Sequence, residues 1–386
     1  MEQQEKLKKV LFVNKFGPVS NAITGQTAKE LADYLHANGC EVRFLCIGAI
    51  YRATKKDPEW QVAYPIKFIR DFYSGDSSAI RFVMSFIDGF RLFVHALRMK
   101  SDAIIVMTEP PLLFFWFQLF RSFIKRKLFY WTMDIYPDAF AAGKFISRAN
   151  IFYRFFASVV YKKAPDLLIA LGEEQRKYLE EKFGSSVPYV VIPCGIVERN
   201  GYPTHAATVS GKIVFGYAGN IGAAHDPDFL TELVKQLDPA RHEMVLSIYG
   251  TKASQVKEAI GNNECIKYRE FLNHDDISAI DINVASLLKE WNHISVPSKA
   301  VTAICCGSTL LLNVPGSADA WQMFGQSAWI VEPGSDYEDG IRRFLQEDLS
   351  EAQILQKRMH ARELAGDWVE KKTEAYKKVL TTIQQS

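Results

Sequence analysis

Short apolar runs alternate with amphipathic helical patterns through the first half of the chain. The runs "KVLFVNKF", "EVRFLCIG", "DAIIVMTE", "KLFYWTMDIYP" and "PYVVIPCGI" are typical of strands. Between the first two, "GQTAKELADYLHANG" places Leu31 and Leu35 four residues apart and ends at Gly39, which predicts a helix. Strands that alternate with helices indicate a parallel sheet covered on both faces.

The pattern is interrupted by a polar stretch at residues 196–211 and then restarts with "KIVFGYAGNIG" and "DPDFLTELVKQL". We expect an inter-domain linker there. The predicted fold is α/β with two doubly wound Rossmann-like domains, residues 1–195 and 196–365. A charged helical tail follows, and we expect its last part, residues 366–386, to pack back on the first domain. Two such domains would turn the carboxyl ends of their strands toward a shared cleft, where ligands bind.

Composition narrows the class of protein. The chain has 386 residues, 48% of them hydrophobic, and a net charge of +2, which argues for globular domains and against a general nucleic-acid binder. The six cysteines include no CxxC spacing, so we expect reduced thiols, no zinc site and a cytoplasmic location. The polar start "MEQQEKLKK" predicts no signal peptide, and no run is long enough to span a membrane.

Glycines concentrate in "GYAGNIGAAHD", residues 216–226, between a predicted strand and a predicted helix. Gly216, Gly219 and Gly222 would let backbone N–H groups approach a phosphate. The spacing differs from the GxGxxG fingerprint, which disfavours NAD. The alternative interpretation is an ordinary turn that uses glycine for its backbone angles.

A second phosphate-binding candidate is "SVPSKAVTAICCG", residues 295–307. Pro297 suits the first turn of a helix, whose free N–H groups attract phosphate. Lys299 would add a mobile positive charge. The alternative is a core helix that carries an exposed lysine.

These motifs occur in an order that resembles family 4 glycosyltransferases, which are retaining enzymes of the GT-B fold. "AGNIG", the "PSK" helix start and "GSTLLLNVPG" carry the resemblance in the second half. "TEPPLL" and "DIYPD" carry it in the first half. The resemblance implies hexosyl or N-acetylhexosaminyl transfer from a nucleotide-diphosphate sugar, without a divalent metal or other cofactor.

The resemblance also implies the site residues. On the donor side, Ser298 and Lys299 would hold the diphosphate. The other expected donor-side residues are Gly219, Asn220, Tyr249, Gly250, Pro297 and Thr302. On the acceptor side we expect Gly25, Asp134 and Asp138. Lys299 and Asp134 are the expected catalytic residues; Asp134 would orient the acceptor hydroxyl or take its proton. A turn or cap aspartate is the alternative for Asp134.

The chain departs from the family pattern at several positions. Asn220 stands where many members have Arg, and Met133 stands where many have His. The family's pair of donor-site glutamates falls by register at Ile294 and Thr302. Thr302 offers one weak hydroxyl bond to the ribose, and Ile294 offers none to the sugar. His293 is a candidate substitute, although a merely packed or surface histidine is the simpler interpretation.

Two segments, "FFWFQLFRSFIKRKLFYW" and "KFISRANIFYRFFASVVYKK", mix aromatic with basic residues. The second contains Arg148, Arg154, Lys162 and Lys163. Such a surface suits peripheral contact with an anionic membrane. The alternative is helices that pack on the sheet and turn their basic residues to water.

The leading hypothesis is a retaining GT-B glycosyltransferase that acts at the cytoplasmic face in bacterial surface-polysaccharide synthesis, on a lipid-linked or saccharide acceptor. Because both glutamates are replaced, a non-catalytic GT-B subunit that scaffolds or anchors a partner transferase is the alternative. A sugar-nucleotide epimerase of the same fold ranks third, since it needs acidic and His residues around the donor sugar that the sequence does not place.

Overall fold

The computed structural model describes residues 7–20, 22–48, 61–71, 78–199, 201, 211–334 and 337–385. The chain forms two compact units: Met1–Cys194 with Lys371–Ser386, and Gly195–Glu370. Much of the linker expected at residues 196–211 lies outside the described residues, namely positions 200 and 202–210.

The first unit contains a parallel sheet of seven strands in the order β3-β2-β1-β4-β5-β6-β7. The strands are β1 (Lys9–Val13), β2 (Glu41–Ile47), β3 (Ile66–Ile69), β4 (Ala103–Val106), β5 (Lys127–Trp131), β6 (Leu167–Ala170) and β7 (Tyr189–Val191). The central β1 pairs with both β2 and β4, and its residues from Val10 to Val13 are buried. The order reverses at β1, which is the arrangement of a doubly wound Rossmann-like sheet.

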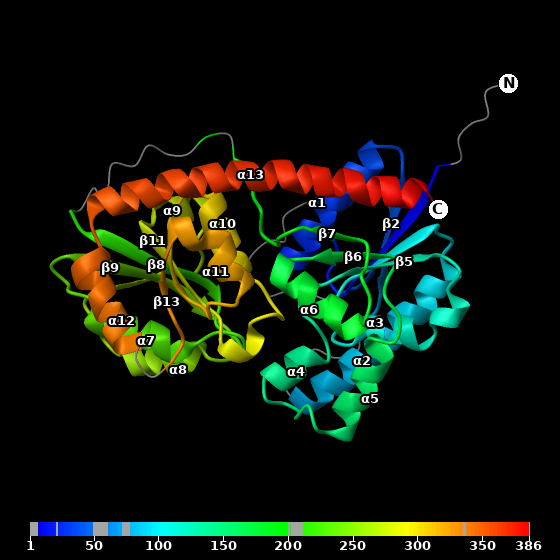
Figure 1. Ribbon diagram of the computed structural model, residues 1–386, viewed down its shortest axis with the longest axis horizontal. Helices are drawn as coiled ribbons and strands as arrows, with labels where there is room; N and C mark the ends of the chain where they lie inside the picture. The colour runs from blue at the N-terminus through cyan, green and yellow to red at the C-terminus, as the bar shows by residue number, and fades with distance from the viewer. Residues whose placement is uncertain are drawn as a thin grey trace. The chain divides into compact units, whose positions relative to one another are not determined.

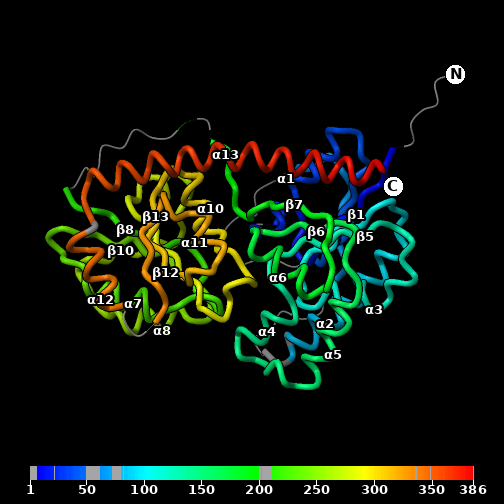
Figure 2. Tube along the Cα trace, in the orientation of Figure 1, coloured from blue at the N-terminus to red at the C-terminus, as the bar shows by residue number. Residues whose placement is uncertain are grey.

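Helices cover this sheet (Figures 1 and 2). They are α1 (Ile23–Ala37), α2 (Ser78–Arg98), α3 (Leu113–Leu119), α4 (Asp138–Ala142), α5 (Ile151–Val160), α6 (Glu173–Phe183) and the 3₁₀ turn η1 (Arg121–Phe123). The expected helix before Gly39 is confirmed as α1, and Gly39 adopts a positive φ of 84° just after it. The sequence patterns did not identify β3 or α2.

The second unit contains a parallel sheet of six strands in the order β10-β9-β8-β11-β12-β13. The strands are β8 (Ile213–Asn220), β9 (His242–Tyr249), β10 (Ile266–Tyr268), β11 (Ile282–Ser286), β12 (Thr309–Asn313) and β13 (Ala328–Val331). Its order reverses at β8, as that of the first sheet does at β1. The expected fold of two doubly wound α/β sheets is therefore confirmed.

The second unit's helices begin with α7, whose first turn is capped by the Asp226 carboxylate. They are α7 (Pro227–Gln236), α8 (Ala253–Ile260), α9 (His274–Ala279), α10 (Ser298–Cys305), α11 (Asp319–Phe324), α12 (Tyr337–Arg343) and α13 (Glu351–Gln384), with short turns η2 (Lys289–Trp291), η3 (Gly325–Ser327) and η4 (Phe344–Asp348). Residues of α13 up to Glu370 belong to this unit and later ones to the first unit. Among the helices of the described residues, none is both long and apolar enough to cross a membrane.

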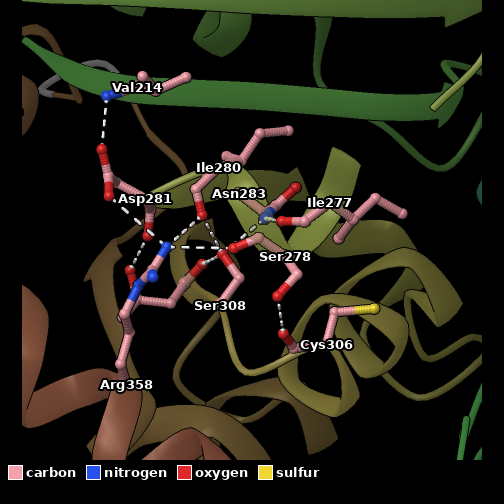
Figure 3. A network of polar contacts seen from close by, with 10 residues as sticks. Val214, Ile277, Ser278, Ile280, Asp281, Asn283, Cys306, Ser308 and Arg358 are labelled. Carbon is pink, nitrogen blue, oxygen red and sulfur yellow. Dashed lines mark hydrogen bonds and ion pairs between the residues drawn. The ribbon is translucent and has the colours of Figure 1, made fainter. Parts of the chain in front are cut away.

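A buried polar network attaches α13 to the amino ends of the strands in the second unit (Figure 3). The Arg358 guanidinium donates to the Ile280 carbonyl at 2.7 Å, and Nη2 of Arg358 lies 3.5 Å from the Asp281 carboxylate. Asp281 in turn accepts from the backbone N–H of Val214 in β8. This network lies at the edge opposite the carboxyl ends of the strands, so it leaves the ligand-binding edge of the sheet to other residues.

Candidate functional site

Two turns meet at the carboxyl ends of β8 and β9. The N–H of Ile221 donates to the Tyr249 carbonyl at 2.7 Å, and the N–H of Lys252 donates to the Ile221 carbonyl at 3.1 Å. Gly219 and Gly250 have φ of 116° and 101°, which favours glycine. A Cβ on Gly250 would lie 1.9 Å from Oδ1 of Asn220, so the Asn220 side chain packs directly on the second turn. The structure thus brings four of the expected donor-side residues together.

Lys299 in the first turn of α10 reaches this pair of turns. Its Nζ donates to the Tyr217 hydroxyl at 2.6 Å and to the Asn220 carbonyl at 2.7 Å. The same Nζ lies 4.1 Å from the centroid of the Tyr217 ring. Burial lowers the pKa of Lys299 well below its usual value. Because burial disfavours the charged amine, an anionic ligand beside it would favour the ammonium form, so this position is suited to such a ligand.

The start of α10 differs by one position from the expectation. The helix begins at Ser298, and Pro297 is the cap residue before it, with φ of −68° and ψ of 101°. The Pro297 carbonyl accepts from the N–H of Ala300 at 2.9 Å. Ser298 is half-buried at the helix start, next to Lys299. Placement of Ser298 and Lys299 at a helix N-terminus is the feature that the phosphate interpretation requires.

Ile294 and Thr302, the two positions where we expect the family's glutamates to be replaced, make other contacts. Thr302 donates its hydroxyl to the Gly195 carbonyl at 3.0 Å. Ile294 is 2% exposed and belongs to the core. Next to it, Nε2 of His293 lies 3.1 Å from Nδ2 of Asn292, an amide nitrogen that only donates. Neither the Ile294 side chain nor the Thr302 side chain can supply the negatively charged hydrogen-bond acceptor that a carboxylate provides.

Sequence reasoning missed two residues beside the glycine-rich turn. Lys252, after β9, donates from Nζ to the His225 carbonyl at 2.7 Å and to the Ala223 carbonyl at 3.4 Å. Nδ1 of His225 lies 2.8 Å from the Ser286 carbonyl. Burial, then the charges of Lys299 and Lys252, lower the pKa of His225 to about 3, so its ring is neutral at pH 7. His225 stood within the quoted glycine-rich motif, whereas no spacing signal pointed to Lys252.

In the first unit, Asp134 follows β5 and has an acidic neighbour, Glu109, which follows β4. Thr24 donates its hydroxyl to the Glu109 carboxylate at 3.3 Å. Burial, then the negative charge of Asp134, raise the pKa of Glu109 to about 7. The backbone N–H of Asp134 donates to Oγ1 of Thr108 at 3.4 Å. Glu109 lay inside the quoted "TEPPLL", but nothing in the sequence paired it with Asp134.

Asp138 is surrounded by tyrosine hydroxyls in the interior of the first unit. Its side chain is fully buried. Tyr153 and Tyr178 donate their hydroxyls to Oδ1 of Asp138 at 2.9 and 2.5 Å, and Tyr161 donates to Oδ2. A carboxylate held by three hydroxyls organises the start of α4, and it has no open side toward a ligand.

Gly25, the remaining acceptor-side residue, lies in α1 where the loop after β1 comes close. A Cβ there would lie 2.3 Å from the Gly17 carbonyl oxygen and 2.9 Å from Oγ of Ser20. Any larger residue would push this loop away from the helix. Gly25 therefore shapes the carboxyl end of β1, and its role toward an acceptor stays a prediction.

Among the described residues, the donor-side turns carry positive side chains rather than a cluster of metal ligands. Within the described ranges, no group of three or more His, Cys, Asp or Glu side chains is placed to hold a metal ion. The positive groups at the donor-side turns are Lys299 and Lys252. These can neutralise an anionic ligand by charge-assisted hydrogen bonds.

No protein-family model matches the chain, and no curated protein sequence matches it. Several solved structures, however, are similar to this chain. Sucrose-phosphate synthase of Thermosynechococcus elongatus aligns with a TM-score of 0.72 and 12% identity, over 98% of this chain and 100% of that chain. HepE of Anabaena, in complex with UDP and glucose, aligns with a TM-score of 0.66 and 14% identity, over 97% and 100%. WaaG, a glycosyltransferase involved in lipopolysaccharide biosynthesis, aligns with a TM-score of 0.65 and 13% identity, over 97% of this chain and 99% of that chain. At these identities the likeness shows the fold, which is GT-B.

Proposed function

We propose that this protein is a glycosyltransferase that moves a sugar from a nucleotide-diphosphate sugar to a lipid-linked or saccharide acceptor, with retention of configuration. The fold supports this proposal. HepE, which was solved in complex with UDP and glucose, and WaaG, a glycosyltransferase involved in lipopolysaccharide biosynthesis, share the fold over nearly the whole of this chain. Fold alone does not fix function. The observation that carries the proposal is Lys299, held at the glycine-rich turn by Tyr217 and the Asn220 carbonyl.

The donor's diphosphate binds at the turns after β8 and β9 and at the start of α10. Gly219 and Gly250 let backbone approach the phosphates, and Asn220 and Tyr249 line the same place. Ser298 and Lys299 bind the phosphate oxygens, with Lys299 turning from the Asn220 carbonyl to the ligand. Lys252 is the second cation near this turn, and it compensates for the family's Arg that Asn220 replaces.

Catalysis rests on charge stabilisation of the leaving group. As the bond between the sugar's anomeric carbon and the phosphate oxygen breaks, negative charge grows on the diphosphate. Lys299, once it has turned from the Asn220 carbonyl, and the N–H groups at the helix start donate to that charge, which lowers the barrier. We propose that these groups make a divalent metal unnecessary.

The acceptor binds to the first unit, with Asp134 orienting the attacking hydroxyl. The hydroxyl oxygen bonds to the anomeric carbon on the face that the diphosphate leaves, and its proton passes to a phosphate oxygen of the leaving group. Glu109 lies beside Asp134, and its pKa of about 7 means that it is only partly ionised at neutral pH, which limits the negative charge of the pair. Asp138 supports this region through its three tyrosines rather than by contact with the acceptor.

The cellular role we propose is bacterial surface-polysaccharide synthesis, with the protein at the cytoplasmic face of the plasma membrane in peripheral contact with it. The segment rich in aromatic and basic residues that contains Arg148, Arg154, Lys162 and Lys163 supports that contact. WaaG, whose fold is similar, is a glycosyltransferase involved in lipopolysaccharide biosynthesis, which is a related role.

A second candidate function is a non-catalytic GT-B subunit that scaffolds or anchors a partner transferase. It is favoured by the buried Ile294 and by the Thr302 hydroxyl already bound to Gly195. Calorimetric titration with UDP, GDP and dTDP separates the two. The glycosyltransferase proposal expects at least one to bind and to raise the melting temperature. If none of the three binds the folded protein, the donor site does not exist and the subunit interpretation stands.

A further inference from the structure

Residues 139–165, which we call the α4–α5 segment, carry charge of one sign. The segment contains five basic residues and neither Asp nor Glu. The basic residues are Lys144, Arg148, Arg154, Lys162 and Lys163, and all five are exposed. Nη2 of Arg148 lies 3.6 Å from the Asp138 carboxylate, which balances part of its charge. The segment still carries an excess of positive charge, to which an anionic partner is complementary.

The same segment exposes large apolar side chains. Phe145 and Ile151 are 75% and 76% exposed, and Phe152 and Phe155 are 64% and 51% exposed. Four such side chains within eleven positions exceed the isolated apolar residues that protein surfaces normally show. An apolar surface of this kind costs free energy in water and is expected to have a partner.

These side chains do not belong to the core of the unit. On α5 the inward positions are Tyr153 and Val160, which are buried, and the Phe156 ring lies 5.2 Å from the Phe115 ring of α3. The helix therefore packs on the unit by one face and exposes apolar groups on another. In α3, by contrast, four of the apolar residues are buried, so helix-on-sheet packing explains that segment.

Helix α2 extends the exposed surface. Figure 1 shows α2, α4 and α5 gathered at the lower edge of the first unit. The Phe82 ring of α2 lies 5.2 Å from the Phe140 ring of α4. Phe82 is itself exposed, and Val83, Ile87 and Phe90 repeat at helical spacing as an exposed apolar stripe. Two helices thus contribute apolar groups beside the cationic segment.

We propose that the α4–α5 segment docks on an anionic lipid bilayer, with Phe145, Ile151, Phe152 and Phe155 inserted between lipids and the five cations at the headgroups. Apolar insertion and attraction to anionic headgroups are the two contributions that together hold a peripheral protein on a membrane. A symmetric contact between two copies through this segment is disfavoured, because it would bring two surfaces with an excess of positive charge against each other. The docking itself is argued from this surface. Its use to the protein, which is to reach a lipid-linked acceptor, rests on the proposed function.

Vesicle co-sedimentation without any nucleotide tests the docking. The protein is mixed with vesicles of phosphatidylcholine alone or of equal parts phosphatidylcholine and phosphatidylglycerol. We expect binding to the anionic vesicles. The double variant Ile151→Ser/Phe152→Ser should lose about tenfold or more in affinity. The triple variant Arg154→Gln/Lys162→Gln/Lys163→Gln should lose about 100-fold on anionic vesicles only. Phe271→Ser, at a 77% exposed position of the second unit, is the matched control and should bind as the wild type does.

A fluorescent label reports insertion directly. All six native cysteines are buried, so Ala149→Cys gives one exposed thiol in the α4–α5 segment for an environment-sensitive dye. Its emission should shift to the blue when anionic vesicles are added, whereas the dye on Asn262→Cys in the second unit should not respond. Nucleotide titration of the same variants must match the wild type, which separates loss of docking from loss of the donor site.

Three outcomes would overturn the proposal. The first is a wild-type protein that ignores anionic vesicles. The second is binding that the double variant and the triple variant leave unchanged. The third is a dimer in light scattering that Ile151→Ser/Phe152→Ser dissociates, since that result would assign the surface to a second copy of the chain.

Discussion

Nζ of Lys299 donates a hydrogen bond of 2.6 Å to the Tyr217 hydroxyl and lies 4.1 Å from the centroid of the same ring. One residue of β8 thus holds a cation from α10 against the glycine-rich turn. The arrangement fixes the lysine before any ligand arrives, which reduces the ordering that binding requires.

Replacement of this lysine tests its role in phosphate binding. Lys299→Met should weaken binding of the preferred nucleoside diphosphate by about 10- to 100-fold, because hydrogen bonds to charged groups contribute about 1.5–3 kcal/mol. Calorimetric titration measures the change. Lys235→Met, on an exposed lysine of α7, is the control and should bind normally. Equal affinity of Lys299→Met and the wild type would remove Lys299 from the donor site.

The carboxyl group of Glu109 should make stability depend on pH. Its pKa in the folded protein is about 7, above the ordinary value of 4.5. The folded state therefore holds this proton more tightly, and the contribution to stability is lost as pH rises from about 5 to 8.

Urea denaturation at several pH values checks this effect. Relative to the Glu109→Gln variant, the wild type should lose up to about 3 kcal/mol between pH 5 and pH 8. Glu181→Gln, at an exposed position of α6, should follow the wild type. Parallel pH profiles of the wild type and Glu109→Gln would show that Glu109 is not perturbed.

The Asp138 carboxylate should stabilise the first unit. Asp138→Ala leaves the hydroxyls of Tyr153, Tyr161 and Tyr178 without their acceptor, and a buried donor without a partner costs about 1–3 kcal/mol. We expect a loss of about 3 kcal/mol or more, measured by urea denaturation. Tyr153→Phe keeps the carboxylate and two donors and should cost about 1 kcal/mol. An Asp138→Ala variant no less stable than Tyr153→Phe would contradict the structural role.

The ribose should be recognised weakly. The Thr302 hydroxyl is bound to the Gly195 carbonyl, and Ile294 offers no polar atom. UDP and 2′-deoxy-UDP should therefore bind with affinities within about threefold, since a lost carboxylate contact would cost about tenfold or more. Competition titration measures the ratio. Discrimination beyond tenfold would mean that another group holds the ribose hydroxyls.

The strands were predictable because buried parallel strands are continuous apolar runs. "KVLFV" and "AIIV" became β1 and β4, and the turn after β8 followed from its glycines. Helix α2 was missed for a physical reason. Its Leu92 and Phe93 are buried, whereas its Ile80, Val83, Ile87 and Phe90 form an exposed apolar stripe, so apolar residues do not mark only the face that packs on the unit.

The candidate site was only partly predictable. A strand end followed by glycines and a Pro-Ser-Lys helix start indicated phosphate binding, and the structure places Lys299 beside Asn220. Glu109, His225 and Lys252 acquire their neighbours only when the strands before them pair in the sheets. No spacing in the sequence encodes that proximity.

The most direct test of the account is turnover. The wild type and Lys299→Met are incubated with UDP, GDP and dTDP sugars, with and without a lipid-diphosphate acceptor, and release of nucleoside diphosphate is measured. We predict release with at least one donor, by transfer or slow hydrolysis, and a loss of about 10-fold or more in Lys299→Met. Binding of a nucleotide without release from any donor sugar would contradict glycosyl transfer and leave the non-catalytic subunit as the function.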